Sequence, residues 1–196
     1  MSILSCAFYL GDTVQTAQRL LGKYVVRMLD GQALVARITE TEAYVGRMDK
    51  AAHAYNYRQT ARNAAMFGPP GHAYVYMIYG MHHCLNFVTE PEAVLLRGLE
   101  PVYGLDEMAR LRFGKTWDAL TRTQRRNITN GPGKCCRALA IDRALNTADL
   151  AGEELFVCTS PADAGLPEVT PPHYTMHTGK RIGIDYAEEA ADFPWR

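Results

Sequence analysis

The feature that most constrains the fold is a pair of strand-like segments joined by a tight turn near the N-terminus. Residues 24–29 and 33–44 contain many β-branched and aromatic side chains, and Asp30-Gly31 lies between them. An Asp-Gly pair in this setting is a strong hairpin signal, because both residues tolerate the positive φ angles that the turn requires. The pattern therefore predicts an antiparallel hairpin.

Three helices are predicted, over residues 12–21, 105–113 and 132–141. Asp12 or Thr13 can cap the first helix, and Gly22 can end it because glycine readily adopts the left-handed conformation. Pro132 suits the first turn of the third helix, where a backbone N–H has no partner within the helix. These helices are expected to flank the strands.

Five further strands are predicted, over residues 73–79, 84–88, 93–96, 154–158 and 180–184. Residues 55–71 are rich in Arg, Asn, Gly and Pro and are predicted to form a long loop, a kind of segment that often carries function. No internal repeat or low-complexity linker interrupts the 196 residues. The sequence therefore predicts a single α+β domain over residues 1–196, with a curved antiparallel or mixed sheet and flanking helices.

The composition excludes several classes of protein. No apolar run approaches the about 20 residues that a transmembrane helix needs. The first ten residues lack a basic region before their apolar stretch, so no secretory signal peptide is expected. The five cysteines are odd in number and irregularly spaced, which is typical of reduced thiols. We therefore expect a cytoplasmic protein that contacts no membrane.

The charge balance bears on nucleic-acid binding. With 21 basic and 21 acidic residues the chain is neutral, which argues against tight duplex binding because phosphate neutralisation supplies much of that affinity. The distribution is uneven, however. Arg58 and Arg62 form one basic cluster. A second cluster consists of Arg110, Arg112, Lys115, Arg122, Arg125 and Arg126. Solvated helix faces explain the second cluster equally well.

A row of carboxylates is the first candidate for chemistry. By the period-two rule, one face of the strand over residues 33–44 carries Leu34, Ala36, Ile38, Glu40, Glu42 and Tyr44. A carboxylate that continues a core-facing row is costly to bury unpaired, and burial would raise its pKa and suit it to proton transfer. The alternative is that Glu40 and Glu42 form a solvated strand end.

Aromatic side chains supply a second candidate. Tyr74, Tyr76 and Tyr79 lie close together and are followed by Gly80 and Asn86. Aromatic faces stack on nucleobases, so a cluster of this kind beside carboxylates suggests chemistry on a flat substrate. A tyrosine-rich strand is equally typical of a protein core.

The remaining candidates are weaker. His82, His83 and Cys84 suggest a metal site, but three adjacent residues of an extended strand cannot all turn toward one ion, and no further ligand motif completes a site. No cofactor-binding glycine-rich loop or Gly-x-Ser-x-Gly turn occurs. The Gly-Pro-Gly before Lys134 can offer backbone N–H groups to a phosphate or can be a simple loop-to-helix turn.

Twelve blocks of the chain occur in the order found in one enzyme family. They are RITETEAY (37–44), AAH (51–53), RQT (58–60), RN (62–63), MF (66–67), YVYMIYGM (74–81), Asn86, VLLR (94–97), EP (100–101), GPGK (131–134), ALAI (138–141) and RIG (181–183). In these blocks the chain closely resembles the alkyladenine (3-methyladenine) DNA glycosylases of the AAG/MPG type. The resemblance covers most of the chain.

The resemblance implies a monofunctional glycosylase that flips an alkylated or deaminated purine out of damaged double-stranded DNA. The enzyme would hydrolyse the N-glycosidic bond and so initiate base excision repair. Glu42 matches the general base that activates the attacking water, and His53 and Arg97 match the residues that hold this water. Tyr44, His53 and Tyr76 match the walls that sandwich the flipped base.

Further positions match the parts of the family that contact DNA. Tyr79 matches the wedge that enters the duplex, and Asn86 matches the residue that disfavours guanine. Arg58, Arg62 and Lys134 are expected to contact the DNA backbone. We expect a bacterial-type protein associated with the nucleoid, and a monomer is the default for a protein that must scan DNA. One carboxylate and one water suffice for the implied reaction, so neither a metal nor a cofactor is expected.

Three alternatives remain open. The chain could be a catalytically inactive nucleic-acid-binding module of the same fold, or a bifunctional lyase in which Lys134 forms a Schiff base with a deoxyribose. It could also be a metal-dependent hydrolase through His82, His83 and Cys84. His82-His83 departs from the aromatic pair expected in the family, which bears on the surroundings of the wedge and on the substrate range.

Overall fold

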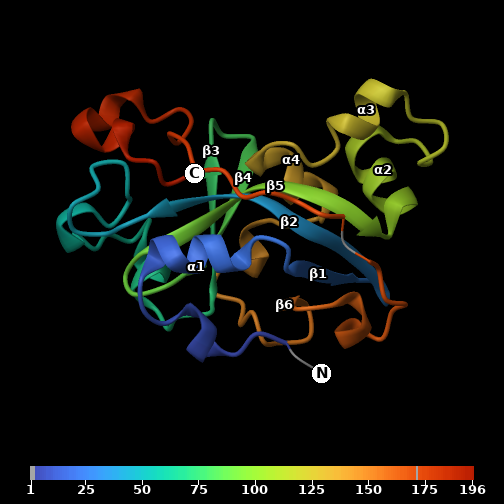
Figure 1. Ribbon diagram of the computed structural model, residues 1–196, viewed down its shortest axis with the longest axis horizontal. Coiled ribbons are helices and arrows are strands. Elements are labelled where there is room, and N and C mark those ends of the chain that lie inside the picture. The colour runs from blue at the N-terminus through green and yellow to red at the C-terminus, as the bar shows by residue number, and fades with distance from the viewer. Residues whose placement is uncertain (1–2, 171) are drawn as a thin grey trace.

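One six-stranded sheet organises the chain, with the strand order β3-β4-β5-β2-β1-β6 (Figure 1). The computed structural model describes residues 3–170 and 172–196. The strands are β1 (Tyr24–Leu29), β2 (Gln32–Tyr44), β3 (Ala73–Ile78), β4 (His82–Val88), β5 (Ala93–Tyr103) and β6 (Leu155–Cys158). All five strand pairs between them are antiparallel. The sheet is therefore antiparallel rather than mixed.

Helices flank this sheet, as the sequence predicts. The α-helices of the described residues are α1 (Thr13–Leu20), α2 (Leu105–Phe113), α3 (Arg122–Arg126) and α4 (Pro132–Ala138). Short 3-10 helices are η1 (Cys6–Tyr9), η2 (Tyr55–Tyr57), η3 (Ala64–Phe67), η4 (Arg143–Leu145), η5 (Pro161–Ala164) and η6 (Asp185–Asp192). The α+β class is confirmed.

The local signals at the N-terminal end of the chain are confirmed. Asp12 caps α1 by accepting a hydrogen bond from the Gln15 N–H. The turn between β1 and β2 has φ angles of 49° at Asp30 and 81° at Gly31, the positive values that an Asp-Gly hairpin turn requires. Local side-chain chemistry is therefore sufficient to place these elements.

Three predictions about helices and loops need correction. The helix predicted to reach Ile141 ends at Ala138, because Ala140 has a φ of 48° and the Ile141 N–H closes the turn on the Cys136 carbonyl. The helix α3 was missed, although its capping box, formed by Thr121 and Gln124, is readable in the sequence. The long loop predicted over residues 55–71 contains η2 and η3.

The strand predicted over residues 180–184 is wrong. These residues belong to no strand, because their polar groups bond to other parts of the chain instead of to a ladder. The Arg181 side chain is buried and donates to the Ala43 carbonyl, and the Ile182 N–H donates to the Glu42 carboxylate.

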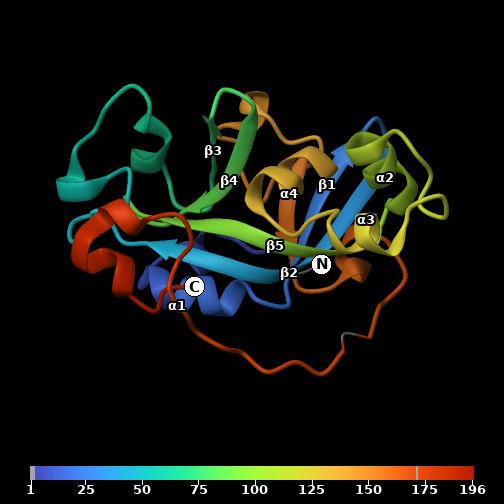
Figure 2. The same ribbon diagram turned by 90° about the horizontal axis from the view of Figure 1, so that it is seen from above.

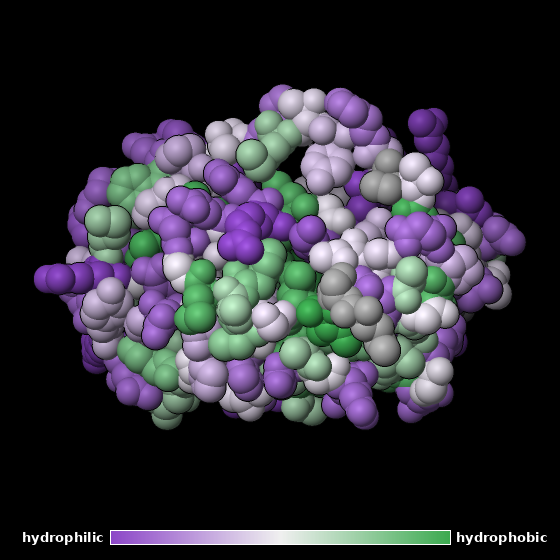
Figure 3. Space-filling view, turned by 60° about the horizontal axis from the view of Figure 1, so that its bottom comes forward, coloured by the Kyte–Doolittle hydropathy of each residue, from purple (hydrophilic) through white to green (hydrophobic). Residues whose placement is uncertain are grey.

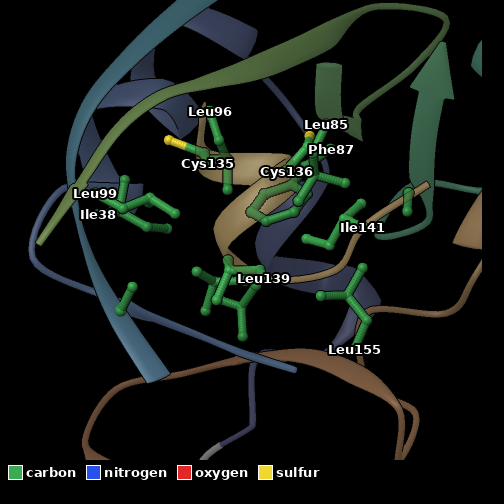
Figure 4. Packing of buried hydrophobic residues seen from close by; sticks show 14 of the residues in the cluster. Ile38, Leu85, Phe87, Leu96, Leu99, Cys135, Cys136, Leu139, Ile141 and Leu155 are labelled. Carbon is green, nitrogen blue, oxygen red and sulfur yellow. The ribbon is translucent and has the colours of Figure 1, made fainter. Parts of the chain in front are cut away.

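The core lies between one face of the sheet and the helices. Figure 4 shows Cys135 and Cys136 of α4 beside Leu96 of β5 and Leu85 of β4, in the same cluster as Leu139. All five cysteines of the chain are free thiols, and all except the exposed Cys6 are buried. Each buried leucine contributes about 1.5–3 kcal/mol relative to an exposed one. No helix among the described residues has the length and apolar composition that crossing a bilayer requires.

The register between β2 and β5 shifts at three points, and the shift at Thr39 overturns the prediction that Leu34 through Tyr44 share one face. The register pairs Ile38 with Leu99, Glu40 with Gly98 and Thr41 with Leu96, which leaves Thr39 and Arg97 unpaired. A bulge adds one residue to a strand and so reverses the alternation of its side chains.

The consequence of the bulges is visible in what the side chains contact. Ile38 and Ala43 both belong to the core cluster although they are five positions apart, and the Thr41 hydroxyl donates to the Ala17 carbonyl of α1. Glu40 and Glu42 therefore lie on the opposite face from the core.

The segment after β6 wraps around this opposite face. Figure 2 shows it leaving the body of the protein as an extended strap and returning as η6. In the space-filling view the strap forms an arch over a hollow (Figure 3). The Trp195 carbonyl accepts a hydrogen bond from the Ala43 N–H, and Gly179 and Arg196 exchange two backbone hydrogen bonds. The C-terminal segment thus covers the end of β2.

Candidate active site

Four adjacent strands present a row of polar and aromatic side chains on the face opposite the core. The register places Tyr74 of β3 opposite Asn86 of β4, Asn86 opposite Leu95 of β5, and Leu95 opposite Glu42 of β2. Residues that far apart in the sequence meet because the sheet places their strands side by side. The row defines the candidate active site.

Glu42 is a fully buried carboxylate at one end of the row. Its Oε1 accepts a hydrogen bond of 2.8 Å from the Ile182 N–H, and its Oε2 accepts one of 2.9 Å from the Tyr44 hydroxyl. Burial raises the pKa of Glu42, and the Glu40 charge adds to this. The Arg97 charge and the two hydrogen bonds act in the opposite direction. Glu42 is therefore held in place with its pKa poised above the ordinary glutamate value.

Arg97 lies between two carboxylates. Its Nε is 3.4 Å from Glu42 Oε1 and 3.3 Å from Glu40 Oε1. This nitrogen is buried and makes no hydrogen bond within the described residues. The bulge at Arg97 aims its side chain toward the carboxylates, and its N–H is free to donate to a further acceptor.

Aromatic rings form the other end of the row. The His53 ring lies 4.6 Å from the Tyr76 ring at an angle of 64°, and Tyr74 lies 5.2 Å from Tyr76 at 35°. A hydrogen bond of 2.9 Å joins His53 Nδ1 to the Tyr74 hydroxyl. The His53 side chain keeps an exposed surface, but desolvation by the protein atoms around it, and then the charge of Arg62, lower its pKa. His53 is therefore favoured in its neutral form.

A small pocket lies among these rings. It is lined by Tyr44, Ala51, His53, Met66, Tyr76 and Asn86. Its volume of about 20 Å³ has room for about one water molecule. A planar ring system can enter only after the side chains that line the pocket have moved. The structure thus brings together four of the residues predicted from the resemblance.

The Tyr44 hydroxyl connects the pocket to the carboxylate. Its ring lines the pocket while its hydroxyl donates to Glu42. The Arg181 guanidinium stacks over the same ring at 4.7 Å. Burial, and then the neighbouring Glu42 charge, raise the pKa of Tyr44, so the phenol stays protonated as a donor.

The Asn86 amide is fixed by the backbone. Its Nδ2 donates to the Tyr74 carbonyl at 3.0 Å, and the residue is 3% exposed. The amide is therefore held in a fixed orientation where it lines the pocket.

Tyr79 lies outside the pocket, at the tip of the β3–β4 hairpin. It is 86% exposed and has a φ of 51°. The strand ends at Ile78, one residue earlier than predicted, so the turn and not the pleat sets its direction. Met77 and Met81 are also exposed beside it. The hairpin therefore presents an apolar tip to solvent.

Lys134 lies near the surface, at the start of α4. A Cβ added to Gly133 would lie 3.1 Å from the His82 Cβ, so the start of α4 packs closely on the hairpin. Lys134 Nζ donates to Asn130 Oδ1 at 2.8 Å.

The loop that carries Arg58 and Arg62 is organised by one asparagine. The Asn63 amide donates to the His53 and Arg58 carbonyls and accepts from the N–H and hydroxyl of Thr60. Arg58 and Arg62 are both exposed. The asparagine thereby fixes the loop between the pocket and the two arginines.

Sequence reasoning missed several residues of the site. The Ile182 N–H and the buried Arg181 reach Glu42 and Tyr44 from the C-terminal segment, and Ala51 and Met66 line the pocket. The only sequence signal for them was membership of the RIG, AAH and MF blocks. His82, His83 and Cys84 do not form a metal cluster, and no group of three metal-binding side chains lies close enough to hold an ion in the described part of the chain.

Comparison with known proteins places this site in a family. Residues 7–196 match the methylpurine-DNA glycosylases (MPG). A protein of Alkaliphilus oremlandii is 50% identical over 193 residues, covering 96% of this chain and 91% of that protein. A protein of Desulfitobacterium hafniense is 47% identical over 200 residues, covering 100% and 94%. One of Bacillus cytotoxicus is 48% identical over 193 residues, covering 96% and 92%.

All three relatives carry the provisional name 3-methyladenine DNA glycosylase. The matched region contains every strand of the candidate site, including those that carry Glu42, Arg97 and the aromatic pocket. With identities near one half over almost the whole chain, the protein belongs to the methylpurine-DNA glycosylase family.

Proposed function

We propose that the protein is a monofunctional DNA glycosylase that removes alkylated or deaminated purines from duplex DNA through a water activated by Glu42. The observation that carries the proposal is the link between the two halves of the site. The Tyr44 ring lines the aromatic pocket, and its hydroxyl holds the fully buried Glu42. A base stacked in the pocket would place its sugar bond near this carboxylate.

The proposed chemistry needs one carboxylate and one water. The bond between the sugar C1′ and the purine nitrogen breaks, and its electron pair leaves with the purine. An alkylated purine carries positive charge, which the electron pair neutralises. Water then attacks the oxocarbenium-like sugar while its proton passes to Glu42. Glu42 also stabilises the positive sugar before attack.

Arg97 and His53 are proposed to hold the water. The Arg97 Nε–H is buried without a hydrogen bond among the described residues, so it can donate to the water oxygen. The lowered pKa of His53 favours the neutral ring, which can accept or donate a hydrogen bond without repelling a cationic purine. Glu42, and not Glu40, accepts a hydrogen bond from Tyr44, whose ring lines the pocket, which favours Glu42 over Glu40 as the base.

The β3–β4 hairpin is proposed to help extrude the base from the duplex into the pocket. Extruding a nucleotide costs a few kcal/mol, which the wedge and the stacking walls offset. The exposed Tyr79 supports the wedge role, and Tyr44, His53 and Tyr76 support the wall role. Asn86 is proposed to disfavour the 2-amino group of guanine. Arg58, Arg62 and Lys134 are proposed to contact phosphates.

We further propose that the protein acts as a cytoplasmic monomer on chromosomal DNA, without metal or lyase chemistry. The Lys134 Nζ donates to the side chains of Asn127 and Asn130, and it would have to give up these hydrogen bonds to form a Schiff base. Borohydride is expected to trap no enzyme–DNA adduct. Chelator is expected to leave the rate unchanged.

The test is single-turnover release of free base from three duplex DNA substrates. One contains a single ethenoadenine, one contains a single hypoxanthine, and one has been methylated. Glu42→Gln should slow release by about 10²–10⁴-fold, the contribution of a general base, while binding to the damaged duplex is retained. Glu153→Gln, which changes an exposed glutamate before β6, is the matched control and should release base at the wild-type rate.

Release that persists in Glu42→Gln would show that another group is the base. If the wild type releases base from none of the three substrates yet binds damaged DNA, the protein is a binding module of the same fold.

A further inference from the structure

The Arg97 Nε lies between two carboxylates and forms a hydrogen bond with neither. Its Nε lies 3.3 Å from Glu40 Oε1 and 3.4 Å from Glu42 Oε1. Neither contact has the geometry of a hydrogen bond. With only one carboxylate nearby, an arginine ordinarily forms short, directed hydrogen bonds to it. The near-equal distances therefore indicate that the two carboxylates hold Arg97 in balance.

Glu40 is itself held from its outer side. The Arg196 Nη1 donates to Glu40 Oε1 at 3.0 Å. The Arg196 Nε donates to the Lys180 carbonyl, and its backbone pairs with Gly179. The position of this guanidinium is thus fixed by main-chain groups.

The backbone opposite Glu40 leaves little room for it to move. A Cβ added at Gly98, its partner in β5, would lie 3.0 Å from the Glu40 Cβ. Together with Arg196, this close packing keeps the Glu40 side chain beside Arg97.

The two carboxylates experience different surroundings. Glu42 is 0% exposed, whereas the Glu40 side chain is 35% exposed. Glu40 faces the hollow under the strap, a cavity of about 310 Å³ that is also lined by Thr39, His177 and Arg196. The same opening is visible in Figure 3. Solvent therefore reaches the Arg196–Glu40 pair but not Glu42.

On the basis of the function proposed above, we propose that Glu40 and Arg196 are positioning residues for the base-release reaction. Glu40 draws Arg97 away from Glu42, which leaves the Glu42 carboxylate and the Arg97 N–H both available to the attacking water. Arg196 holds Glu40 at the distance that maintains this balance. Neither residue touches the base or the sugar.

Removal of Glu40 and removal of Arg196 should shift the pKa of Glu42 in opposite directions. Without the Glu40 charge, Arg97 closes on Glu42, stabilises its ionised form and lowers its pKa. Without the Arg196 charge, Glu40 is less neutralised and disfavours ionisation of Glu42, which raises that pKa. The charged or titratable groups around Glu42 on every neighbouring element are Glu40, Tyr44, Tyr76, Cys84, Arg97, Arg181 and Arg196. All except Glu40 and Arg196 stay unchanged in the test.

The test follows the acidic limb of the pH–rate profile under single-turnover conditions. Methylated duplex DNA is the substrate, because a cationic purine leaves without prior protonation and the acidic limb then reports on Glu42. Glu40→Gln should slow release about tenfold or more and shift the limb to lower pH by about one unit. Arg196→Gln should shift it to higher pH, and Arg196→Lys should restore the wild-type profile.

Lys180→Gln is the matched control. Lys180 lies on the same segment and pairs with Asp192 instead of with Glu40, so its loss should not move the limb. The proposal would be overturned if the acidic limb moved in the same direction in Glu40→Gln and Arg196→Gln. It would also be overturned if the limb moved in neither variant.

A second measurement does not depend on catalysis. The Glu42 carboxyl carbon is followed by NMR during an acid titration of the free enzyme with ¹³C-labelled glutamate, and it is assigned by its loss in Glu42→Gln. The midpoint of the Glu42 titration is expected to move to lower pH in Glu40→Gln and to higher pH in Arg196→Gln. If the wild type releases no base but these shifts are seen, the proposed function fails while the charge coupling stands. If base is released but the Glu42 titration is unmoved, only the positioning role is overturned.

Discussion

Glu42 combines two properties that oppose each other at the level of a single residue. To act as the proposed base it must be ionised, yet its side chain is fully buried and burial raises its pKa. In the unfolded chain the same carboxyl has its ordinary pKa. The native state therefore binds the proton more tightly, and ionising Glu42 lowers the stability of the fold as the pH rises.

Replacement of Glu42 should for this reason increase stability. We expect Glu42→Gln to raise the free energy of unfolding at pH 8 by about 1 kcal/mol, the usual size of a single-residue effect, because it removes a buried charge. The sign follows from the raised native pKa. The gain is present above that pKa and disappears as the pH falls below the ordinary value of a glutamate, where the carboxyl is protonated in both states.

Urea unfolding of the wild type and of Glu42→Gln at pH 8 and at pH 4 measures the difference. The amide oxygen can still accept the Ile182 N–H, so this hydrogen bond is retained. A variant that is less stable at both pH values would contradict the prediction and would mean that hydrogen bonding to the carboxylate outweighs its desolvation.

At the scale of elements, the sequence predicts where strands lie better than which way their side chains point. The hairpin of β1 and β2 follows from Asp30-Gly31, a local signal. The bulges at Thr39 and Arg97 reverse the faces of β2 and β5, and no side chain marks them because register is set between strands. The alternation therefore placed Glu42 on the core face, which is wrong.

A buried ion pair holds the C-terminal segment to the turn that follows β2. Both side chains of the Arg181–Asp49 pair are 0% exposed. Arg181 also donates to the carbonyls of Ala43 and Ala190, and Asp49 accepts from the Ala51 N–H. Within this pair, only the Arg181 Nε has no hydrogen-bond partner among the described residues, and the remaining contacts anchor the segment that delivers the Ile182 N–H to Glu42.

Breaking this pair should release the segment. We expect Arg181→Met to lower the free energy of unfolding by about 3–5 kcal/mol, because it leaves the Asp49 charge buried without a partner. It should also slow base release, since the hydrogen bond to Glu42 loses its support. Urea unfolding at pH 7.5 and single-turnover release measure the two effects.

Two further variants make the interpretation specific. Lys180→Met removes the adjacent exposed pair with Asp192 and should change stability by less than about 1 kcal/mol. Adding Asp49→Asn to Arg181→Met should restore part of the loss, because it removes the unpaired charge. Equal effects of Arg181→Met and Lys180→Met would show that the burial of the pair does not matter.

At the scale of the whole molecule, the site is completed by chain that is distant in sequence. The contact between Ile182 and Glu42 joins residues 140 positions apart, and Arg196 reaches Glu40 across 156. Periodicity and capping act within a few residues and carry no information on such contacts. This is why residues 180–184 were predicted to be a strand and why Arg181 was missed, although the α+β class was predicted correctly.

The charge of the whole molecule sets how DNA binding depends on salt. The chain carries 21 basic and 21 acidic residues, and ion pairs occupy many of the basic ones, such as Arg27, Arg37 and Arg110. Arg58 and Arg62, by contrast, are exposed on the loop that follows His53. A protein with few available cations releases few counterions from DNA, so its affinity should fall gently with salt.

We therefore expect the logarithm of the affinity for duplex DNA to fall linearly with the logarithm of salt concentration, with a slope of about −0.9 for each phosphate contact. Arg58→Ala, Arg62→Ala and Lys134→Ala should each make the slope less steep by about one unit. Arg19→Ala is the matched control, because Arg19 is exposed on α1 and lies over the Phe8 ring. Fluorescence anisotropy with Glu42→Gln as the background keeps the DNA intact during the titration.

If a variant weakens binding while its slope equals that of the background, the residue acts on the loop or hairpin and not on a phosphate. A slope changed by Arg19→Ala would place the duplex on the α1 side of the sheet and would contradict the proposed orientation.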